Sequence, residues 1–269
     1  MSLHITSAAN PRLKALATLR RRRGREQTGQ TLVEGYDELG LALSAGVCPQ
    51  TLFLCPDLMA DPAGQQDVVD TATAAGAEVI TLSRAAFEKV AYREGADGFL
   101  AVVPAVLARP EDLELPAQPL LLVAEAVEKP GNLGAMLRTA DAAGVDAFVA
   151  ADPVTDWGNP NVVRASKGTV FSVPVAAAPT TATLQWLSAH GVRLVATTPD
   201  TDTLHTDVDL TGPVAIAVGT EKTGLTEEVL DAADVKVRIP MSGIVNSLNV
   251  ATSAAIVIYE AVRQRRSGG

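Results

Sequence analysis

The chain of 269 residues lacks the features that mark several classes of protein. It has no apolar run near the roughly 20 residues that a membrane-spanning helix needs, and its first residues, MSLHITSAANPRLK, lack the apolar core of a signal peptide. Its two cysteines, Cys48 and Cys55, have the spacing of neither a redox pair nor a zinc site. Its three histidines, His4, His190 and His205, are far apart, so we expect no His-built metal site. These absences favour a cytoplasmic protein with reduced thiols and without a bound metal.

Aromatic residues are also few, at 4%, but hydrophobic residues make up 47% of the chain, which predicts a globular protein of one large or two modest domains. The net charge of −9 argues at first against a nucleic-acid partner. Its distribution argues otherwise, because residues 1–30 carry a net charge of +6 and leave −15 for the rest. A basic segment on an acidic body is suited to phosphates.

The same basic segment also has a purely structural interpretation. Leu13, Leu16 and Leu19 fall on one side of a helix, so the basic groups would occupy its solvated face. We nevertheless take these groups as candidate RNA-binding residues: Arg12, Lys14, Arg20, Arg21, Arg22, Arg23 and Arg25.

Strands and helices alternate along both halves of the chain, which predicts two α/β domains. The first covers residues 1–106. Residues 107–118 are predicted as a linker because prolines and charged residues cluster there. The second domain, residues 119–269, contains long apolar strands, as expected for a parallel sheet.

The stretch EKPGNLGAMLRTADAAG, residues 128–144, predicts a helix with Asn132 as N-cap and Gly144 as its stop. Arg138 lies opposite the apolar stripe of this helix, so it faces either solvent or an anionic ligand. Only Gly131 and Gly134 are present, so the dinucleotide-binding fingerprint is not met, which makes a nucleotide-cofactor oxidoreductase improbable.

Two further strand ends carry polar residues. In VAIAVGTEKTGL, residues 214–225, Gly219 and Gly224 allow close backbone approach to a ligand, and Glu221 is either a solvated acid or a ligand-binding group. In IPMSGIVNSLNVATSAAIVIYEA, residues 239–261, Ser247 or Asn246 is predicted to cap the last helix and Asn249 to lie in its first turn. Capping explains one of these polar groups and leaves the others free to face a ligand.

A fourth stretch, NVVRASKGTVFSVPV at residues 161–175, is a basic loop with Arg164 and Lys167. Taken together in chain order, the four stretches resemble the SpoU (TrmH-type) family of RNA ribose 2′-O-methyltransferases, within the SPOUT superfamily. The likeness covers most of residues 120–263. The N-terminal stretch SAANPRLKALATLRRRRGREQTGQTLVEGYDEL also resembles the small substrate-binding α/β domain of that family, which is similar to RNA-binding ribosomal proteins.

The resemblance implies a C-terminal domain knotted as a trefoil, a homodimer, and S-adenosylmethionine bound against the knotted loops. Ile239, Met241 and Leu248 would supply the apolar contacts to its adenine. The complete set of cofactor-binding residues that it implies is Gly219, Thr220, Glu221, Gly224, Ile239, Met241, Ser247, Leu248 and Asn249.

The implied catalytic residues are Arg138, Asn132, Glu221, Ser247 and Asn249. No histidine lies in any of the motifs to accept the proton of the ribose hydroxyl. Arg138 is therefore either an assisted base, as the family proposal has it, or a clamp on a substrate phosphate while the other groups orient the hydroxyl. Arg164 and Lys167 join the candidate RNA-binding residues.

The chain departs from the family pattern at Lys129, where many members carry Asp before the proline, and at Asn246, where a small or acidic residue is common. We expect an enzyme that methylates ribosomal RNA, most of all 23S RNA, in either a housekeeping or an antibiotic-resistance role. The alternatives are a transfer-RNA 2′-O-methyltransferase and a non-catalytic RNA-binding protein on the same fold.

Overall fold

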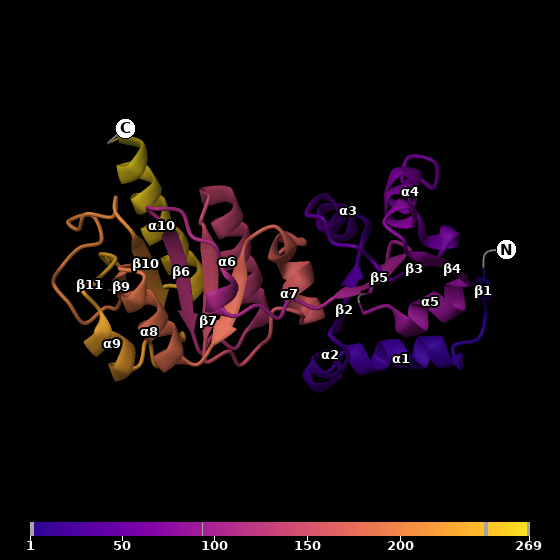
Figure 1. Ribbon diagram of the computed structural model, residues 1–269, viewed down its shortest axis with the longest axis horizontal. Coiled ribbons are helices and arrows are strands. Elements are labelled where there is room, and N and C mark those ends of the chain that lie inside the picture. Colours follow the sequence, from indigo (N-terminus) through magenta and orange to yellow (C-terminus); the bar gives the residue numbers. More distant parts are fainter. Residues whose placement is uncertain (1–2, 93, 245–246, 268–269) are drawn as a thin grey trace. The chain divides into compact units, whose positions relative to one another are not determined.

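The computed structural model describes residues 3–92, 94–244 and 247–267. The chain forms two compact units (Figure 1). The first consists of Met1–Leu107 together with Asp156–Ser172, and the second of Ala108–Thr155 together with Val173–Gly269. None of the described helices is both long enough and apolar enough to cross a membrane.

The first unit is built on a five-stranded mixed sheet in the order β1-β4-β3-β5-β2. Strands β1, β4 and β3 are parallel, and β5 runs antiparallel to both β3 and β2. The strands are β1 (Leu3–Ile5), β2 (Gln30–Glu34), β3 (Thr51–Leu54), β4 (Glu78–Leu82) and β5 (Phe99–Pro104). The helices are α1 (Pro11–Leu19), α2 (Arg22–Thr28), α3 (Tyr36–Ser44), α4 (Gln66–Ala74), α5 (Arg84–Val90) and α7 (Pro160–Ala165), with the short 3₁₀ helices η1 (Pro56–Leu58) and η3 (Thr169–Phe171).

Helix α1 shows how the sequence sets these elements. Asn10 caps it by accepting a hydrogen bond from the Arg12 amide, and Pro11 occupies the first helical position, where it is favoured. Leu13, Leu16 and Leu19 are buried, as their spacing predicts. These leucines join Phe53, Phe87 and Leu100 in one apolar core beneath α1 and α5.

The second unit is built on a six-stranded, all-parallel sheet in the order β11-β9-β10-β6-β7-β8. Its strands are β6 (Leu120–Glu125), β7 (Ala147–Ala151), β8 (Val175–Ala178), β9 (Arg193–Thr197), β10 (Val214–Val218) and β11 (Val235–Val237). The central strands are buried on both faces, which explains their continuous apolar sequences. The helices are α6 (Pro130–Ala143), α8 (Thr180–Ala189), α9 (Glu227–Ala232) and α10 (Val250–Ser267), with 3₁₀ helix η2 (Pro110–Asp112).

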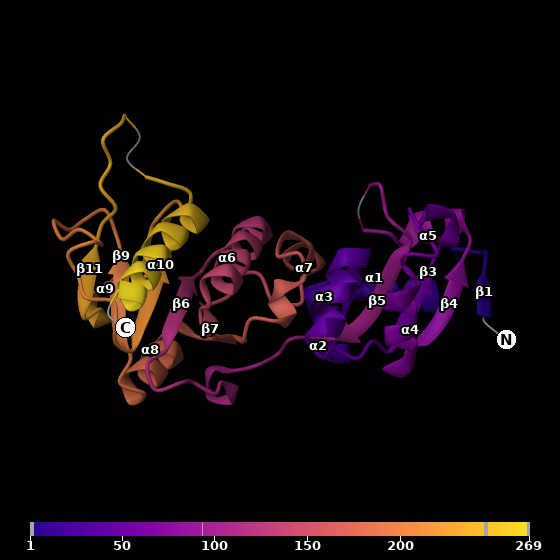
Figure 2. The same cartoon turned by 90° about the horizontal axis from the view of Figure 1, so that it is seen from above.

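The helices of the second unit form a layer on each face of this sheet (Figure 2). Helix α10 packs against α6, β10 and β6 on one face, and α8 and α9 pack together on the other. The parallel sheet predicted for this half of the chain is confirmed. Strands β1 and β8 and helix α7 were not predicted from the sequence. The stretch predicted as a linker is also packed, because Leu113 and Leu115 lie against the core of the second unit.

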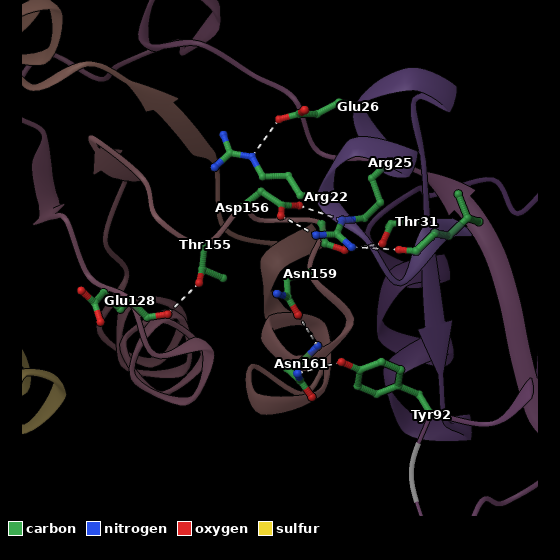
Figure 3. A network of polar contacts seen from close by, with 12 residues as sticks. Arg22, Arg25, Glu26, Thr31, Tyr92, Glu128, Thr155, Asp156, Asn159 and Asn161 are labelled. Carbon is green, nitrogen blue, oxygen red and sulfur yellow. Dashed lines mark hydrogen bonds and ion pairs between the residues drawn. The ribbon is translucent and has the colours of Figure 1, made fainter. Parts of the chain in front are cut away.

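Residues Asp156–Ser172 leave the parallel sheet after β7 and pack on the first unit (Figure 3). The Arg25 guanidinium donates to both carboxylate oxygens of Asp156, at 2.9 and 2.5 Å, and to the Leu19 carbonyl at 2.8 Å. The Thr31 hydroxyl donates to the Gly158 carbonyl, and the Asn161 amide donates to the Tyr92 hydroxyl at 2.9 Å. Arg25 is only 2% exposed, so its prediction as an RNA contact is wrong: its charge is used inside the fold.

We expect the substitution Arg25→Met to lower the free energy of unfolding of the first unit by about 3 kcal/mol, because removal of one partner leaves the Asp156 carboxylate largely buried without its cation. Arg22→Met is the matched control. Arg22 pairs with Glu26 at the surface, where such a pair is worth under about 1 kcal/mol. Urea unfolding followed by the fluorescence of buried Trp157, with the second tryptophan replaced by Trp186→Phe, measures both. Equal losses in the two variants would contradict a special role for the buried pair.

Candidate functional site

A cavity of about 460 Å³ opens in the second unit, beside the carboxyl ends of β9 and β10. Ligands of parallel α/β sheets bind at this edge, because the loops that follow neighbouring strands meet there. Of the predicted cofactor-binding residues, those that line the cavity are Gly219, Thr220, Glu221, Gly224, Ile239, Met241, Ser247 and Leu248. Asn249 does not line the cavity, but its amide donates a hydrogen bond to Glu221, which does line it.

The end of β9 also contributes to the cavity, which was not predicted from the sequence. Thr197, Thr198, Pro199 and Asp200 follow or end that strand, and all four line the cavity. The Thr197 hydroxyl is buried and has no hydrogen-bond partner among the described residues. The signal was present in the sequence, because the apolar residues of β9 are followed directly by a run of polar residues. What was lacking was the knowledge that β9 and β10 are neighbours in the sheet.

The loop from Gly219 to Gly224 closes on itself. The Thr220 amide donates to the Gly224 carbonyl and the Gly224 amide to the Thr220 carbonyl, each at 3.0 Å. A Cβ atom on Gly219 would lie 2.1 Å from the Gly224 carbonyl group, and Gly224 itself has a left-handed φ of +71°. Both positions therefore require glycine, and the loop presents backbone groups directly to the cavity.

A cluster of polar side chains from three separate elements lies at the rim of this cavity. The Asn132 amide donates to Glu221 Oε1 at 3.1 Å, and the Asn249 amide donates to the same oxygen at 2.6 Å and to Asn132 Oδ1 at 3.1 Å. The Lys129 ammonium donates to the other oxygen, Glu221 Oε2. The three residues Asn132, Glu221 and Asn249 are called the amide–carboxylate cluster below.

The surroundings of Glu221 favour its ionised form. The hydrogen bond from Lys129 is the largest cause, and the bond from Asn132, the charge of Lys129 and the bond from Asn249 add to it. Together they hold the pKa of the Glu221 carboxyl below its usual value, against a smaller opposing effect of desolvation. At neutral pH this site therefore contains a fixed carboxylate that accepts from two amides.

Two cap assignments made from the sequence are wrong. Helix α6 begins at Pro130, so Asn132 is its third residue and Lys129 holds the N-cap position. Helix α10 begins at Val250, and Asn249 caps it by accepting hydrogen bonds from the Ala251 and Thr252 amides, at 3.0 and 3.4 Å. The proposed cap at Asn246 lies outside the described residues. Asn249 thus uses its oxygen to hold the helix and its amide to hold the cluster.

Arg138 lies on the exposed side of α6, as its position opposite the apolar stripe predicts. It forms no hydrogen bond or ion pair within the described part of the chain. Its guanidinium is therefore free to meet an anionic ligand. The structure does not bring Arg138 into the amide–carboxylate cluster, and Ser247 lines the cavity without joining that cluster.

The candidate RNA-binding residues of the first unit differ in how far their side chains are engaged within the fold. Arg20 is tied down: it donates to the carbonyls of Val90 and Ala91, at 2.8 and 3.0 Å, and lies over the ring of Tyr92. Arg12 and Arg22 are exposed but engaged in the ion pairs with Glu78 and Glu26. The remaining candidates are exposed: Lys14, Arg21, Arg23, Arg164 and Lys167.

Comparison with known proteins gives two family matches. The model of the SpoU rRNA Methylase family matches residues 119–259, and that of the MRM3-like substrate binding domain matches residues 10–101. A curated relative, the 23S rRNA (guanosine(2553)-2'-O)-methyltransferase RlmP of Bacillus subtilis, is 31% identical over 95% of this chain and 97% of its own length.

Solved structures give the same result. A crystal structure of an RNA 2'-O ribose methyltransferase has a TM-score of 0.84 and 40% identity over 98% of this chain and all of its own. The AdoMet-bound rRNA methyltransferase from Sinorhizobium meliloti has a TM-score of 0.88 and 29% identity over 97% of each chain. The fold therefore agrees with that of known RNA methyltransferases along almost the whole chain.

Proposed function

The chain belongs to the SpoU rRNA methylase family, and we propose that it transfers a methyl group from S-adenosylmethionine to a ribose 2′-hydroxyl of RNA, with 23S ribosomal RNA as the substrate. The observation that carries this proposal is the cavity at the carboxyl edge of the parallel sheet, with the amide–carboxylate cluster at its rim.

The residues of the cavity fit S-adenosylmethionine. The backbone of the Gly219–Gly224 loop is open to the cavity, and Ile239, Met241 and Leu248 provide an apolar wall. The buried Thr197 hydroxyl has no hydrogen-bond partner among the described residues, so it can bond to a ligand. The cofactor supplies an electrophilic methyl group. The chain's own residues must hold the ribose hydroxyl in line with that methyl and provide a route for its proton.

In this proposal, the amide–carboxylate cluster orients the ribose and Arg138 binds the neighbouring RNA phosphate. An exposed arginine that has no partner among the described residues is suited to a phosphate, because its planar guanidinium forms two parallel hydrogen bonds. The exposed position of Arg138 supports the phosphate clamp over the assisted base, because a guanidinium offers five N–H donors and no acceptor. The proton of the hydroxyl then leaves through water.

The exposed basic residues Lys14, Arg21, Arg23, Arg164 and Lys167 form the proposed RNA-binding set. We further propose a homodimer, a trefoil knot in the C-terminal segment and a cytoplasmic location, in keeping with a ribosomal substrate. The predicted alternatives, a transfer-RNA substrate and a non-catalytic RNA-binding role, are less well supported. A relative that covers 95% of the chain and a second that covers 75% of it carry 23S rRNA names, and the motif side chains needed for chemistry are all present.

The function is tested by incubating the protein with tritiated S-adenosylmethionine and total RNA from a strain that lacks the gene. We expect label at a ribose of 23S RNA and a loss of about 100-fold or more for Arg138→Ala, because phosphate contacts position the reacting groups. Arg266→Ala, an exposed arginine of α10, is the control and keeps full activity. Label in transfer RNA, or none at all in free or ribosomal RNA, contradicts the proposal.

The RNA-binding set is tested by neutralising two of its members together, Arg21→Gln and Arg23→Gln. Fewer phosphate contacts release fewer counterions, so affinity for 23S RNA falls and the slope of log K against log salt becomes shallower by about 1–2. The double variant Arg84→Gln, Lys89→Gln removes two exposed charges from α5 of the same unit and serves as the control. An equal effect of both pairs would mean that net charge, and not this surface, drives binding. Filter binding at several salt concentrations provides the measurement.

A further inference from the structure

Lys129 is an unfavourable residue at the start of α6. It occupies the N-cap position, where Ser, Thr, Asp or Asn is preferred, and its side chain makes no capping hydrogen bond. Its positive charge also lies at the positive end of the helix dipole of a helix of 14 residues. A residue that breaks two local rules at once points to a role outside the helix, as is typical of functional sites.

The structure shows where the Lys129 side chain goes. Its ammonium pairs with Oε2 of Glu221, while Oε1 of the same carboxylate accepts from the Asn132 and Asn249 amides. Lys129 and Asn132 lie at the start of α6 and Asn249 precedes α10, so the carboxylate joins the loop after β10 to the starts of two helices. The other charged group beside Glu221 in the sequence is Lys222 of its own loop.

We infer that Lys129 is a positioning residue for the proposed methyl transfer: its ammonium holds the Glu221 carboxylate in the orientation that bonds both amides of the cluster. Without it, the carboxylate can rotate towards solvent and release Asn132. Asn249 keeps its place in either case, because its oxygen caps α10. Lys129 itself touches neither the cavity nor the reacting atoms in this account; it acts through Glu221.

The same contact has a consequence for pH dependence. Lys129 is the largest cause of the lowered pKa of Glu221, so in the intact protein the carboxylate stays ionised to a pH below its usual range. Activity that needs this carboxylate is present above that pKa and is lost as the pH falls through it. Removal of Lys129 raises the pKa of Glu221, and the acid limb of the pH profile then moves to higher pH.

The variant Lys129→Ser tests the inference, which rests on the proposed function. We expect it to slow methyl transfer without lowering the melting temperature. Serine is a good N-cap, so the melting temperature stays equal or rises. Methyl transfer in the single-turnover regime slows on the order of 10-fold, because the cluster is less well positioned. The dissociation constant of S-adenosylmethionine, measured by calorimetry, stays unchanged. Lys129→Arg restores the rate and the pH profile, and Lys129→Met, of similar length without charge, does not.

A readout independent of activity completes the test. The carboxyl carbon of Glu221, assigned by its loss in Glu221→Gln, is titrated by ¹³C NMR in the intact protein and in Lys129→Ser. A titration at higher pH in the variant supports the inference even if the intact protein transfers no methyl group, in which case only the proposed function fails. An unchanged Glu221 titration, or a parallel loss of melting temperature and rate, overturns the inference.

Discussion

The site depends on one shared acceptor, the Oε1 oxygen of Glu221, which receives hydrogen bonds from Asn132 and Asn249. These two amides are 117 residues apart in the chain and bond to each other as well. A carboxylate with such partners fixes the amide orientation of both, because each NH₂ group can donate only if it faces an oxygen. The start of α6, the loop after β10 and the start of α10 are thereby held in one arrangement at the rim of the cavity.

The parallel sheet makes this meeting possible. Strands β6 and β10 are neighbours and run in the same direction, so the loops that follow them leave from the same edge. Helix α10 packs on α6 and β10, which brings its capping residue Asn249 to that edge. The two glycines of the Gly219–Gly224 loop then allow the backbone to close tightly enough for Glu221 to face both helices. The fold thus provides the positions, and the hydrogen bonds fix the side chains.

Much of this was accessible from the sequence, for identifiable reasons. The apolar strands, the stripe of α6 and the αL stop at Gly144 follow local rules of periodicity and capping, and all are present in the structure. Gly219, Glu221 and Asn249 stood out because polar groups follow buried strands or open an apolar helix. The contribution of Thr197 did not stand out, because it depends on which strands are neighbours. Lys129 stood out only as a departure from the family pattern, because its role depends on a contact between residues 92 positions apart. Arg25 was misassigned for the same reason: its partner Asp156 lies in a distant segment, and a buried arginine looks like an exposed one in sequence.

The claim that Asn132, Glu221 and Asn249 act as one unit is tested most directly by a double-mutant cycle. Asn132→Ala removes one amide, and Asn249→Ser removes the other while a serine still caps α10. Single-turnover methyl transfer is measured for both single variants and for the double variant. The account predicts that the double variant is scarcely slower than the slower single variant, because either change already disrupts the cluster. Rate losses that simply multiply would show that the two residues act independently, and would contradict it.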